Sequence, residues 1–354
     1  MTRENNKILM TGNEAIAEGA LQSGCNFYAG YPITPQNELT AYMARRMPER
    51  KGVFIQAESE LAAINMVFGA AASGARAMTS SSSPGISLKQ EGISYMAGAE
   101  LPAVIVNVMR GGPGLGNIWP SQSDYFQATR SGGHGDYHTI VLAPACVQEA
   151  YEMMPLAFSL ADKYLIPSMI LSDGMLGQMM EPILAYHNDK RYAISDKLKS
   201  WALTGCKGRK PNIVKSFYLR EGDLETFNLK LQKKYTQIRE KEQRYESVSL
   251  EDAQIILVAY GSMARITKNV VYDLRKKGKK IGLIRPITLW PFPKKAFTSH
   301  LSPKIRYLVI EMSYGQMLED VRLTVNGKVK VEFLGRAGGG IPTEKEIVKS
   351  LSRL

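Results

Sequence analysis

The sequence has few cysteines, no long apolar run and no leader-like start. Only three of its 354 residues are cysteines, Cys25, Cys146 and Cys206, and they lie far apart. This odd, scattered set excludes a disulfide framework and the spacings of zinc or iron–sulfur sites. The longest apolar stretches, such as PAVIV and IILVA, are too short to span a bilayer. The first residues, MTRENNKILM, lack the layout of a signal peptide, so we expect a cytoplasmic protein with no membrane partner.

Acidic residues are also in short supply, since the net charge is +12 and the pI is about 9.4. Lys and Arg are concentrated between His187 and Leu250 and in RKKGKK at 275–280. No aromatic-interleaved RNA motif or recognition-helix pattern accompanies them, so we expect no nucleic-acid partner. Two interpretations remain for the basic segments: solvated faces, or a docking face for an acidic carrier protein.

The first 180 residues alternate between two local signals, and a chain of this length predicts two domains. Short β-branched and aromatic runs predict strands at 25–31, 53–57, 75–79, 103–109, 139–143 and 167–172. Amphipathic or Ala-rich stretches predict helices at 13–24, 36–47, 59–74 and 147–164. Strand–helix alternation at this spacing indicates an α/β fold with a mostly parallel sheet and helices on both faces.

The alternation lapses from about Glu181 and resumes near residue 253. Polar, basic sequence lies between, with one predicted helix at 223–245. The apolar stripe of this helix is expected to pack on a domain and consists of Leu224, Phe227, Leu231, Tyr235 and Ile238. The second alternating unit predicts a smaller α/β domain of about 100 residues.

Polar residues follow the predicted strands at the points where ligands bind to open parallel sheets. They are Thr34 after the first strand, Glu58 after the second, Ser80–Ser83 after the third, Arg110 after the fourth and Asp173 after the last. We therefore expect Thr34, Glu58, the serines and Arg110 to face one crevice. The glycines at 111–116 do not open a helix in the dinucleotide-binding pattern, so a Rossmann site is rejected.

Each of these residues also has a purely structural interpretation. Thr34 before Pro35 is a good helix N-cap followed by proline at the first helical position. Glu58 and Glu60 flank a helix start, where acidic residues suit the helix dipole. The serines could cap the next helix or present hydroxyls to an anion. Arg110 ends an apolar strand beside two glycines, which suits a planar partner such as a carboxylate.

Four motifs together carry a family resemblance. They are YPITP at 31–35, QAESE at 56–60, VMRGGPG at 108–114 and SDGMLGQMMEP at 172–182. The chain resembles the alpha subunit of 2-oxoacid:ferredoxin oxidoreductases over essentially its whole length. Its closest resemblance is to the 2-oxoisovalerate (3-methyl-2-oxobutanoate) branch, and the 2-oxoglutarate branch is a near relative. The resemblance implies a pyrimidine-binding thiamine diphosphate domain at 1–186, a basic, partly helical linker at 187–250 and a transketolase C-terminal-like domain at 251–354.

The resemblance also implies roles for single residues. Glu58 would be the catalytic acid against the aminopyrimidine ring of thiamine diphosphate, while Glu60 is expected on the helix surface. Arg110 would clamp the substrate carboxylate, and Thr34 would lie near the substrate oxygens, its hydroxyl accepting from a helix N–H and donating to the ligand. The residues implied to contact the cofactor are Tyr31, Pro32, Glu58 and Ser82.

The chain lacks a GDG…N diphosphate–magnesium motif and a cysteine cluster. The resemblance therefore implies a beta subunit that carries the diphosphate-binding domain, with no metal held by this chain. Mg²⁺ and the iron–sulfur clusters would lie on partner subunits, among them gamma and ferredoxin-like subunits. Coenzyme A would be the co-substrate and ferredoxin the electron acceptor. We expect a hetero-oligomer in which this chain alone is inactive.

The expected reaction is oxidative decarboxylation of 2-oxoisovalerate to acyl-CoA and CO₂. The alternative substrate is 2-oxoglutarate, whose second carboxylate would need another cation. Lys89 is the obvious candidate, but it is expected on a helix surface, which favours the branched-chain acid. A non-catalytic scaffold subunit is the alternative from a different class.

Overall fold

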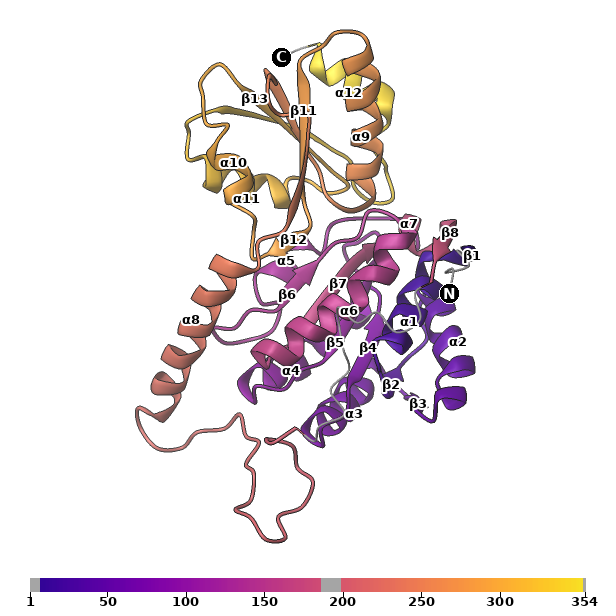
Figure 1. Ribbon diagram of the computed structural model, residues 1–354, viewed down its shortest axis with the longest axis vertical. Coiled ribbons are helices and arrows are strands. Elements are labelled where there is room, and N and C mark those ends of the chain that lie inside the picture. The colour runs from indigo at the N-terminus through magenta and orange to yellow at the C-terminus, as the bar shows by residue number, and fades with distance from the viewer. Residues whose placement is uncertain (1–6, 186–198, 353–354) are drawn as a thin grey trace, which may run out of the picture.

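The computed structural model describes residues 7–185 and 199–352. They form two α/β parts stacked one above the other, with the long helix α8 (Asp223–Lys241) extending beside the first (Figure 1). Within these ranges no helix is both long and apolar enough to cross a bilayer.

The first part is built on a seven-stranded sheet in the order β12-β6-β7-β5-β4-β2-β3. Its strands are β2 (Phe27–Gly30), β3 (Val53–Gln56), β4 (Ala77–Ser81), β5 (Val104–Met109), β6 (Ile140–Leu142), β7 (Ser168–Asp173) and β12 (Thr288–Trp290). All neighbouring strands are parallel except β12, which runs antiparallel to β6. The mostly parallel sheet predicted from the sequence is therefore confirmed.

Helices cover both faces of this sheet. They are α1 (Gly12–Gln22), α2 (Asn37–Arg46), η1 (Pro48–Arg50), α3 (Glu60–Ala72), α4 (Pro84–Gly98), α5 (Tyr125–Thr129), α6 (Val147–Tyr164) and α7 (Gly174–Gln178). The chain moves outward from β2 to β3 and then back across β2 to β4. Right-handed crossovers consequently place α2 and α3 on opposite faces. Helix α1 packs between α2 and α6, whereas α3 packs against α4.

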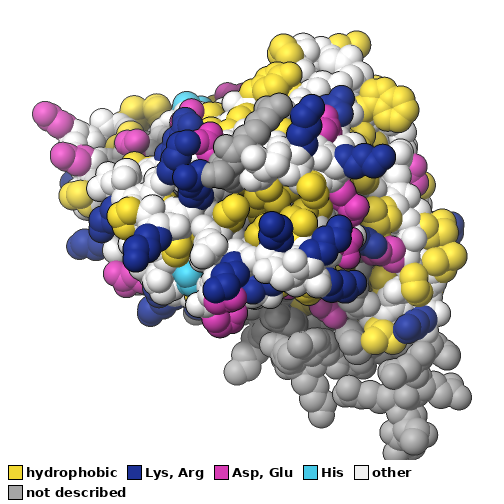
Figure 2. All heavy atoms as spheres, turned by 90° about the horizontal axis from the view of Figure 1, so that it is seen from above, with side chains coloured by type: hydrophobic (Ala, Val, Ile, Leu, Met, Phe, Trp, Pro, Cys, Tyr) yellow, Lys and Arg dark blue, Asp and Glu magenta, His cyan; other side chains and the backbone are white. Residues whose placement is uncertain are grey.

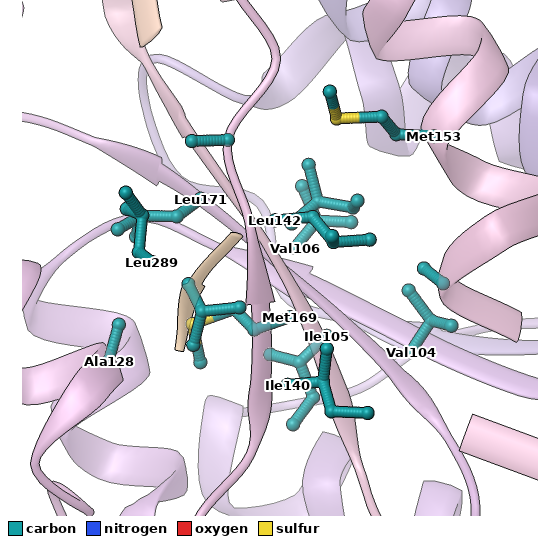
Figure 3. Packing of buried hydrophobic residues seen from close by; sticks show 14 of the residues in the cluster. Val104, Ile105, Val106, Ala128, Ile140, Leu142, Met153, Met169, Leu171 and Leu289 are labelled. Atoms are coloured by element: carbon teal, nitrogen blue, oxygen red, sulfur yellow. The ribbon is translucent and has the colours of Figure 1, made fainter. Parts of the chain in front are cut away.

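The core of the first part is centred on its middle strands. Both β5 and β7 are buried along their whole length, as expected for a sheet with helices on both sides. Figure 3 shows their apolar side chains packed with those of β6 and with Leu289 of β12. The described chain also has a two-stranded antiparallel sheet of β1 (Lys7–Thr11) and β8 (Met180–Leu184), which the sequence patterns did not predict.

The second part has a five-stranded sheet in the order β14-β13-β10-β11-β9. Its strands are β9 (Tyr245–Val248), β10 (Ile255–Val258), β11 (Ile281–Pro286), β13 (Arg306–Glu311) and β14 (Lys330–Gly335), and only β9 is antiparallel to its neighbour. Its helices are α9 (Gly261–Lys276), α10 (Lys295–Thr298), α11 (Gln316–Val325) and α12 (Glu344–Leu351). Strand β9 comes from the expected linker, and β12 reaches back to the first sheet. The expected domain boundaries remain a prediction.

The predicted helix in the linker is present as α8. Leu231, Tyr235 and Ile238 of its apolar stripe are buried, while Leu224 at its start is 49% exposed. The stripe therefore packs on the domain over two of its turns. Part of the expected linker, 186–198, lies outside the described residues.

The basic cluster predicted at 275–280 lies on the surface of the second part. Parallel strands leave their amino ends at one edge, and Lys279, Lys280, Lys304 and Lys328 are exposed in the loops that precede these ends. Figure 2, which views the molecule from above, shows Lys and Arg side chains around apolar ones on this face. The carboxyl ends of the strands point toward the first part, where Gln122 donates to the Tyr260 carbonyl and accepts from the Met312 N–H, both at 2.9 Å.

Candidate active site

The carboxyl ends of β2, β4 and β5 are tied together by hydrogen bonds. Arg110, which directly follows β5, donates from Nη1 to the Thr34 carbonyl at 2.9 Å, and Thr34 lies in the loop after β2. The Arg110 backbone N–H donates to Ser83 Oγ, just after β4, at 3.0 Å. Three segments that are far apart in sequence thus meet at one point, at the carboxyl edge of the parallel strands.

The Arg110 side chain is buried but not neutralised. Its second nitrogen, Nη2, donates to the Leu115 carbonyl at 3.1 Å, while Nε is buried without a partner. No carboxylate in the described chain forms an ion pair with it. A guanidinium carries five N–H donors, and within residues 7–185 and 199–352 only two of those of Arg110 are occupied. The remaining donors and the uncompensated charge suit an anionic ligand.

A hydrogen-bond network of Ser83, Asn107 and Asp124 holds the backbone of Arg110 in place. Ser83 Oγ donates to Asp124 Oδ2 at 2.6 Å, and Asn107 Nδ2 donates to the same oxygen at 2.9 Å. Burial raises the pKa of the Asp124 carboxyl, although both hydrogen bonds oppose this. Ser83 has a φ of 23°, a strained conformation for a residue with a side chain, so the network holds it against its backbone preference.

Thr34 is not the N-cap of α2, which corrects one of its two interpretations. The helix begins at Asn37, and Gln36 is its N-cap without a side-chain cap bond. The turn through Ile33 and Gln36 delays the helix, because the Gln36 N–H donates to the Ile33 carbonyl at 3.0 Å. The Thr34 hydroxyl accepts from the Asn37 side-chain amide at 3.2 Å rather than from a helix N–H. It is therefore not committed to a backbone group.

The four serines at 80–83, which end β4 and follow it, have different environments. Ser80 Oγ is bonded to Tyr28 and Gln36, both at 2.6 Å, and burial raises the pKa of Tyr28 to about 12. Ser81 Oγ and Ser82 Oγ are buried without a hydrogen-bond partner. Since buried hydroxyls are rarely left unsatisfied, these two are the serines suited to a ligand.

The two acids of QAESE differ in their exposure to solvent. Glu58 is exposed beside the edge strand β3, whereas Glu60 is only 6% exposed. The prediction that Glu60 lies on the helix surface is therefore wrong. Ser59 caps α3, so Glu60 is its first residue, and α3 packs against α4 at this point. No residue of the described chain donates a hydrogen bond to the Glu60 carboxylate.

Lys89 is fully buried, which corrects its predicted position on a helix surface. Its helix, α4, is covered by α3 and by the sheet, and Nζ donates to Thr79 Oγ1 at 2.5 Å and to the Ser80 carbonyl at 3.1 Å. Burial lowers the pKa of Lys89 to about 7, and the charge of Glu60 opposes this shift. The weak amphipathicity of PGISLKQEGISYMAG is the only sequence signal that could have indicated burial.

Asp173, the acid after β7, has structural partners. Its Oδ1 accepts from the N–H groups of Met175 and Leu176, so it caps α7, and Oδ2 accepts from Ser262 of the second part at 2.5 Å. Burial raises the pKa of this carboxyl, although its hydrogen bonds oppose the shift. The arrangement connects the two parts of the molecule rather than offering Asp173 to a ligand.

The segment after Arg110 forms an exposed apolar rim that sequence reasoning missed. Leu115, Ile118 and Trp119 are 81%, 56% and 63% exposed, although the segment is ordered by bonds such as Asn117 Nδ2 to the Gly338 carbonyl at 3.0 Å. Exposed apolar clusters beside a site are typical of protein interfaces. The described residues contain no group of three or more His, Cys, Asp or Glu side chains that could hold a metal ion.

Two family models match consecutive segments of the chain. Residues 18–247 match the family of pyruvate flavodoxin/ferredoxin oxidoreductases, thiamine diphosphate-binding, and residues 253–347 match the pyruvate:ferredoxin oxidoreductase core domain II. The ketoisovalerate oxidoreductase subunit VorB of Methanothermobacter marburgensis is 48% identical over 98% of this chain and 97% of its own length. The 2-oxoglutarate synthase subunit KorA of Archaeoglobus fulgidus is 38% identical over 92% of this chain and 94% of its own.

A solved structure of similar fold completes the comparison. The 2-oxoglutarate:ferredoxin oxidoreductase of Magnetococcus marinus, with 2-oxoglutarate, coenzyme A and succinyl-CoA bound, has a TM-score of 0.89 and 27% identity. The match covers 99% of this chain and 66% of that one. The thiamine diphosphate-binding α/β fold expected from the sequence is confirmed. The chain belongs to the 2-oxoacid:ferredoxin oxidoreductase family and is one of its subunits.

Proposed function

We propose that this chain supplies the pyrimidine-binding half of the active site of a cytoplasmic enzyme that oxidises 2-oxoisovalerate to an acyl-CoA and CO₂ and reduces ferredoxin. The observation that carries this proposal is the buried Arg110 guanidinium, which meets the β2 loop but has no carboxylate partner among the described residues. A 2-oxoacid carboxylate is a ligand that would complete it. The relative with 48% identity, named a ketoisovalerate oxidoreductase subunit, supports the choice of substrate.

The residues at this edge fit one end of thiamine diphosphate. Ser82 offers a buried hydroxyl without a partner, and Glu60 offers a buried carboxylate to a ring that can share a proton with it. Tyr31 and Pro32 are exposed at the rim, where they could flank the same ring. When bound, thiamine diphosphate supplies the nucleophilic carbon and the electron sink for decarboxylation.

We assign the proton-sharing acid to Glu60 in preference to Glu58. An acid that exchanges a proton with a heterocycle works best when water is kept away from it, and Glu60 is the buried member of the pair. Glu58 stands exposed beside β3 and would serve only if a partner subunit covered it. Glu60→Gln in the assembled complex should abolish turnover and preserve assembly, whereas Glu58→Gln should retain at least a tenth of the rate.

Arg110 acts on the substrate carboxylate before CO₂ leaves. Its position is set by the Ser83 network and by the Thr34 and Leu115 carbonyls, so little side-chain motion has to be arrested on binding. The Thr34 hydroxyl can donate to a substrate oxygen, since its own partner is a donor. After decarboxylation the anionic group is gone, and the interaction with the arginine is lost with it.

The site requires companion subunits. The exposed rim at Leu115–Trp119 and the apolar helix α3, which leaves Leu61 48% exposed, favour contact with another chain. We assign the diphosphate and Mg²⁺ to a beta subunit, and the iron–sulfur clusters to gamma and ferredoxin-like subunits. Within this chain we assign 1–186 to the pyrimidine-binding domain, 187–250 to the basic linker and 251–354 to the transketolase C-terminal-like domain. The isolated chain should be inactive, and 2-oxoacid oxidation by the purified chain alone would refute this assignment.

The choice between 2-oxoisovalerate and 2-oxoglutarate depends on a second cation. The Lys89 ammonium is directed at Thr79 and Ser80 inside the domain, so it does not serve a distal carboxylate. The decisive experiment measures kcat/KM of the co-expressed complex with both acids. We expect a preference of at least tenfold for 2-oxoisovalerate, and a preference for 2-oxoglutarate would contradict the substrate assignment. A non-catalytic scaffold would show no rate with either acid.

A further inference from the structure

Lys89 is a buried charge for which the proposed mechanism has no direct use. Its residue exposure is 0%, and its ammonium has two oxygen acceptors, Thr79 Oγ1 and the Ser80 carbonyl, but no carboxylate within ion-pair distance in the described ranges. Lysines are almost never fully buried without a paired charge, because desolvating the ammonium is costly. A contribution to stability therefore does not explain why a lysine occupies this position.

The position of Lys89 connects it to Glu60. Gly85 and Lys89 are one turn apart on α4 and lie on the same face. A Cβ atom at Gly85 would stand 2.6 Å from Glu60 Oε1, so the carboxylate of α3 lies directly over this face. Two turns further along α4, Gly92 admits Ile64 in the same way. The helices therefore cross closely, and the charge of Glu60 acts on Lys89.

We propose that Lys89 is a positioning residue for Glu60, whose buried ammonium supplies the counter-charge that holds the Glu60 carboxylate at the carboxyl edge of the sheet. Lys89 touches neither the substrate nor the cofactor and acts through Glu60 alone. Its own position is fixed by Ser80, which is bonded to Tyr28 and Gln36. The inference rests on the proposed role of Glu60, and the experiment separates the two.

The experiment compares four variants of the co-expressed complex: Lys89→Met, Lys89→Gln, Glu60→Gln and the double variant Lys89→Met/Glu60→Gln. We expect Lys89→Met to lower kcat about tenfold or more and to leave KM for the 2-oxoacid within twofold, because Arg110 is untouched. Lys89→Gln keeps a hydrogen-bond donor but no charge, so its kcat should fall as much as that of Lys89→Met. The double variant should be no slower than Glu60→Gln alone. Lys277→Met, at an exposed lysine, is the control.

A second readout uses the isolated chain without cofactor. Lys89→Met leaves the buried Glu60 carboxylate without its counter-charge, so it should lower the unfolding temperature of the wild-type chain at pH 7 but not that of Glu60→Gln. An equal fall in unfolding temperature in the wild-type and Glu60→Gln backgrounds, wild-type kcat in Lys89→Gln, or additive losses in the double variant would each overturn the role of Lys89. Wild-type turnover in Glu60→Gln would instead refute the proposed function itself.

Discussion

Replacing Gly85 by alanine should damage catalysis while it spares the fold. The new Cβ atom would lie 2.6 Å from Glu60 Oε1, whereas ordinary contacts begin at 3.4 Å. The carboxylate must therefore move by about 0.8 Å, the difference between the two distances. The Ser81 hydroxyl must also rotate away, because it too lies against this position. A displacement of about 1 Å at a reacting group lowers rates by roughly 10²-fold, so we expect kcat of the complex to fall about a hundredfold.

The stability of the Gly85→Ala chain should change far less. Alanine improves helix propensity by about 1 kcal/mol, and overpacking costs roughly 1–3 kcal/mol, so the net loss should be about 0–2 kcal/mol in urea unfolding. The matched control is Gly69→Ala on α3, where no atom lies within 4 Å of the added Cβ. It should gain up to about 1 kcal/mol in urea unfolding of the isolated chain. Wild-type kcat in Gly85→Ala would show that the position of Glu60 is not critical.

Substitutions at three further positions test the site and the scaffold. Arg110→Lys keeps the charge but loses the fork that reaches Thr34 and Leu115, so KM for the 2-oxoacid should rise about 10–100-fold in steady-state assays. Among the described residues, the Thr34 hydroxyl is bonded only to the Asn37 side chain. Thr34→Val should therefore keep the unfolding temperature constant while kcat/KM falls several-fold. Thr34→Ser keeps the hydroxyl, so its effect on kcat/KM should be small. Burial alone would raise the pKa of Glu242, but hydrogen bonds from Lys163, Tyr164 and Arg244 lower it to about 2. The contribution of Glu242 to the free energy of unfolding should be complete above pH 4.5 and be lost as the pH falls toward 2. In Glu242→Gln, the free energy of unfolding should therefore depend less on pH in that range.

The fold followed from local patterns because both sheets contain short, largely apolar strands between clear helices. β5 and β7 are apolar runs bounded by polar residues, and they are central strands. The pattern failed where tertiary contacts decide pairing. β1 is a short strand near the start of the described chain whose partner, β8, lies about 170 residues away, and β12 joins a sheet formed otherwise by the first part. No local period marks such pairings.

The site was predictable in position but not in detail. Arg110 and Thr34 meet because parallel strands end at one edge, a rule that needs only the strand order. Whether a side chain faces the crevice depends on where the next helix begins. The turn at Ile33–Gln36 shifts α2 by two residues relative to a cap at Thr34, and that turn is set by tertiary bonds such as Asn13 Nδ2 to the Pro35 carbonyl at 2.7 Å.

The two glutamates of QAESE show how packing assigns roles that composition leaves equal. Both follow β3 and both suit a helix start, so the choice between them depends on what α3 touches. Gly85 and Gly92, seven residues apart on α4, remove the side chains that would keep the helices separated, and they admit Glu60 and Ile64. A glycine pair at this spacing, opposite an Ala-rich helix, is readable in the sequence as a close crossing. Glu60 lies at that crossing and Glu58 lies outside it, so the same glycines that join the helices also remove one of the two acids from water.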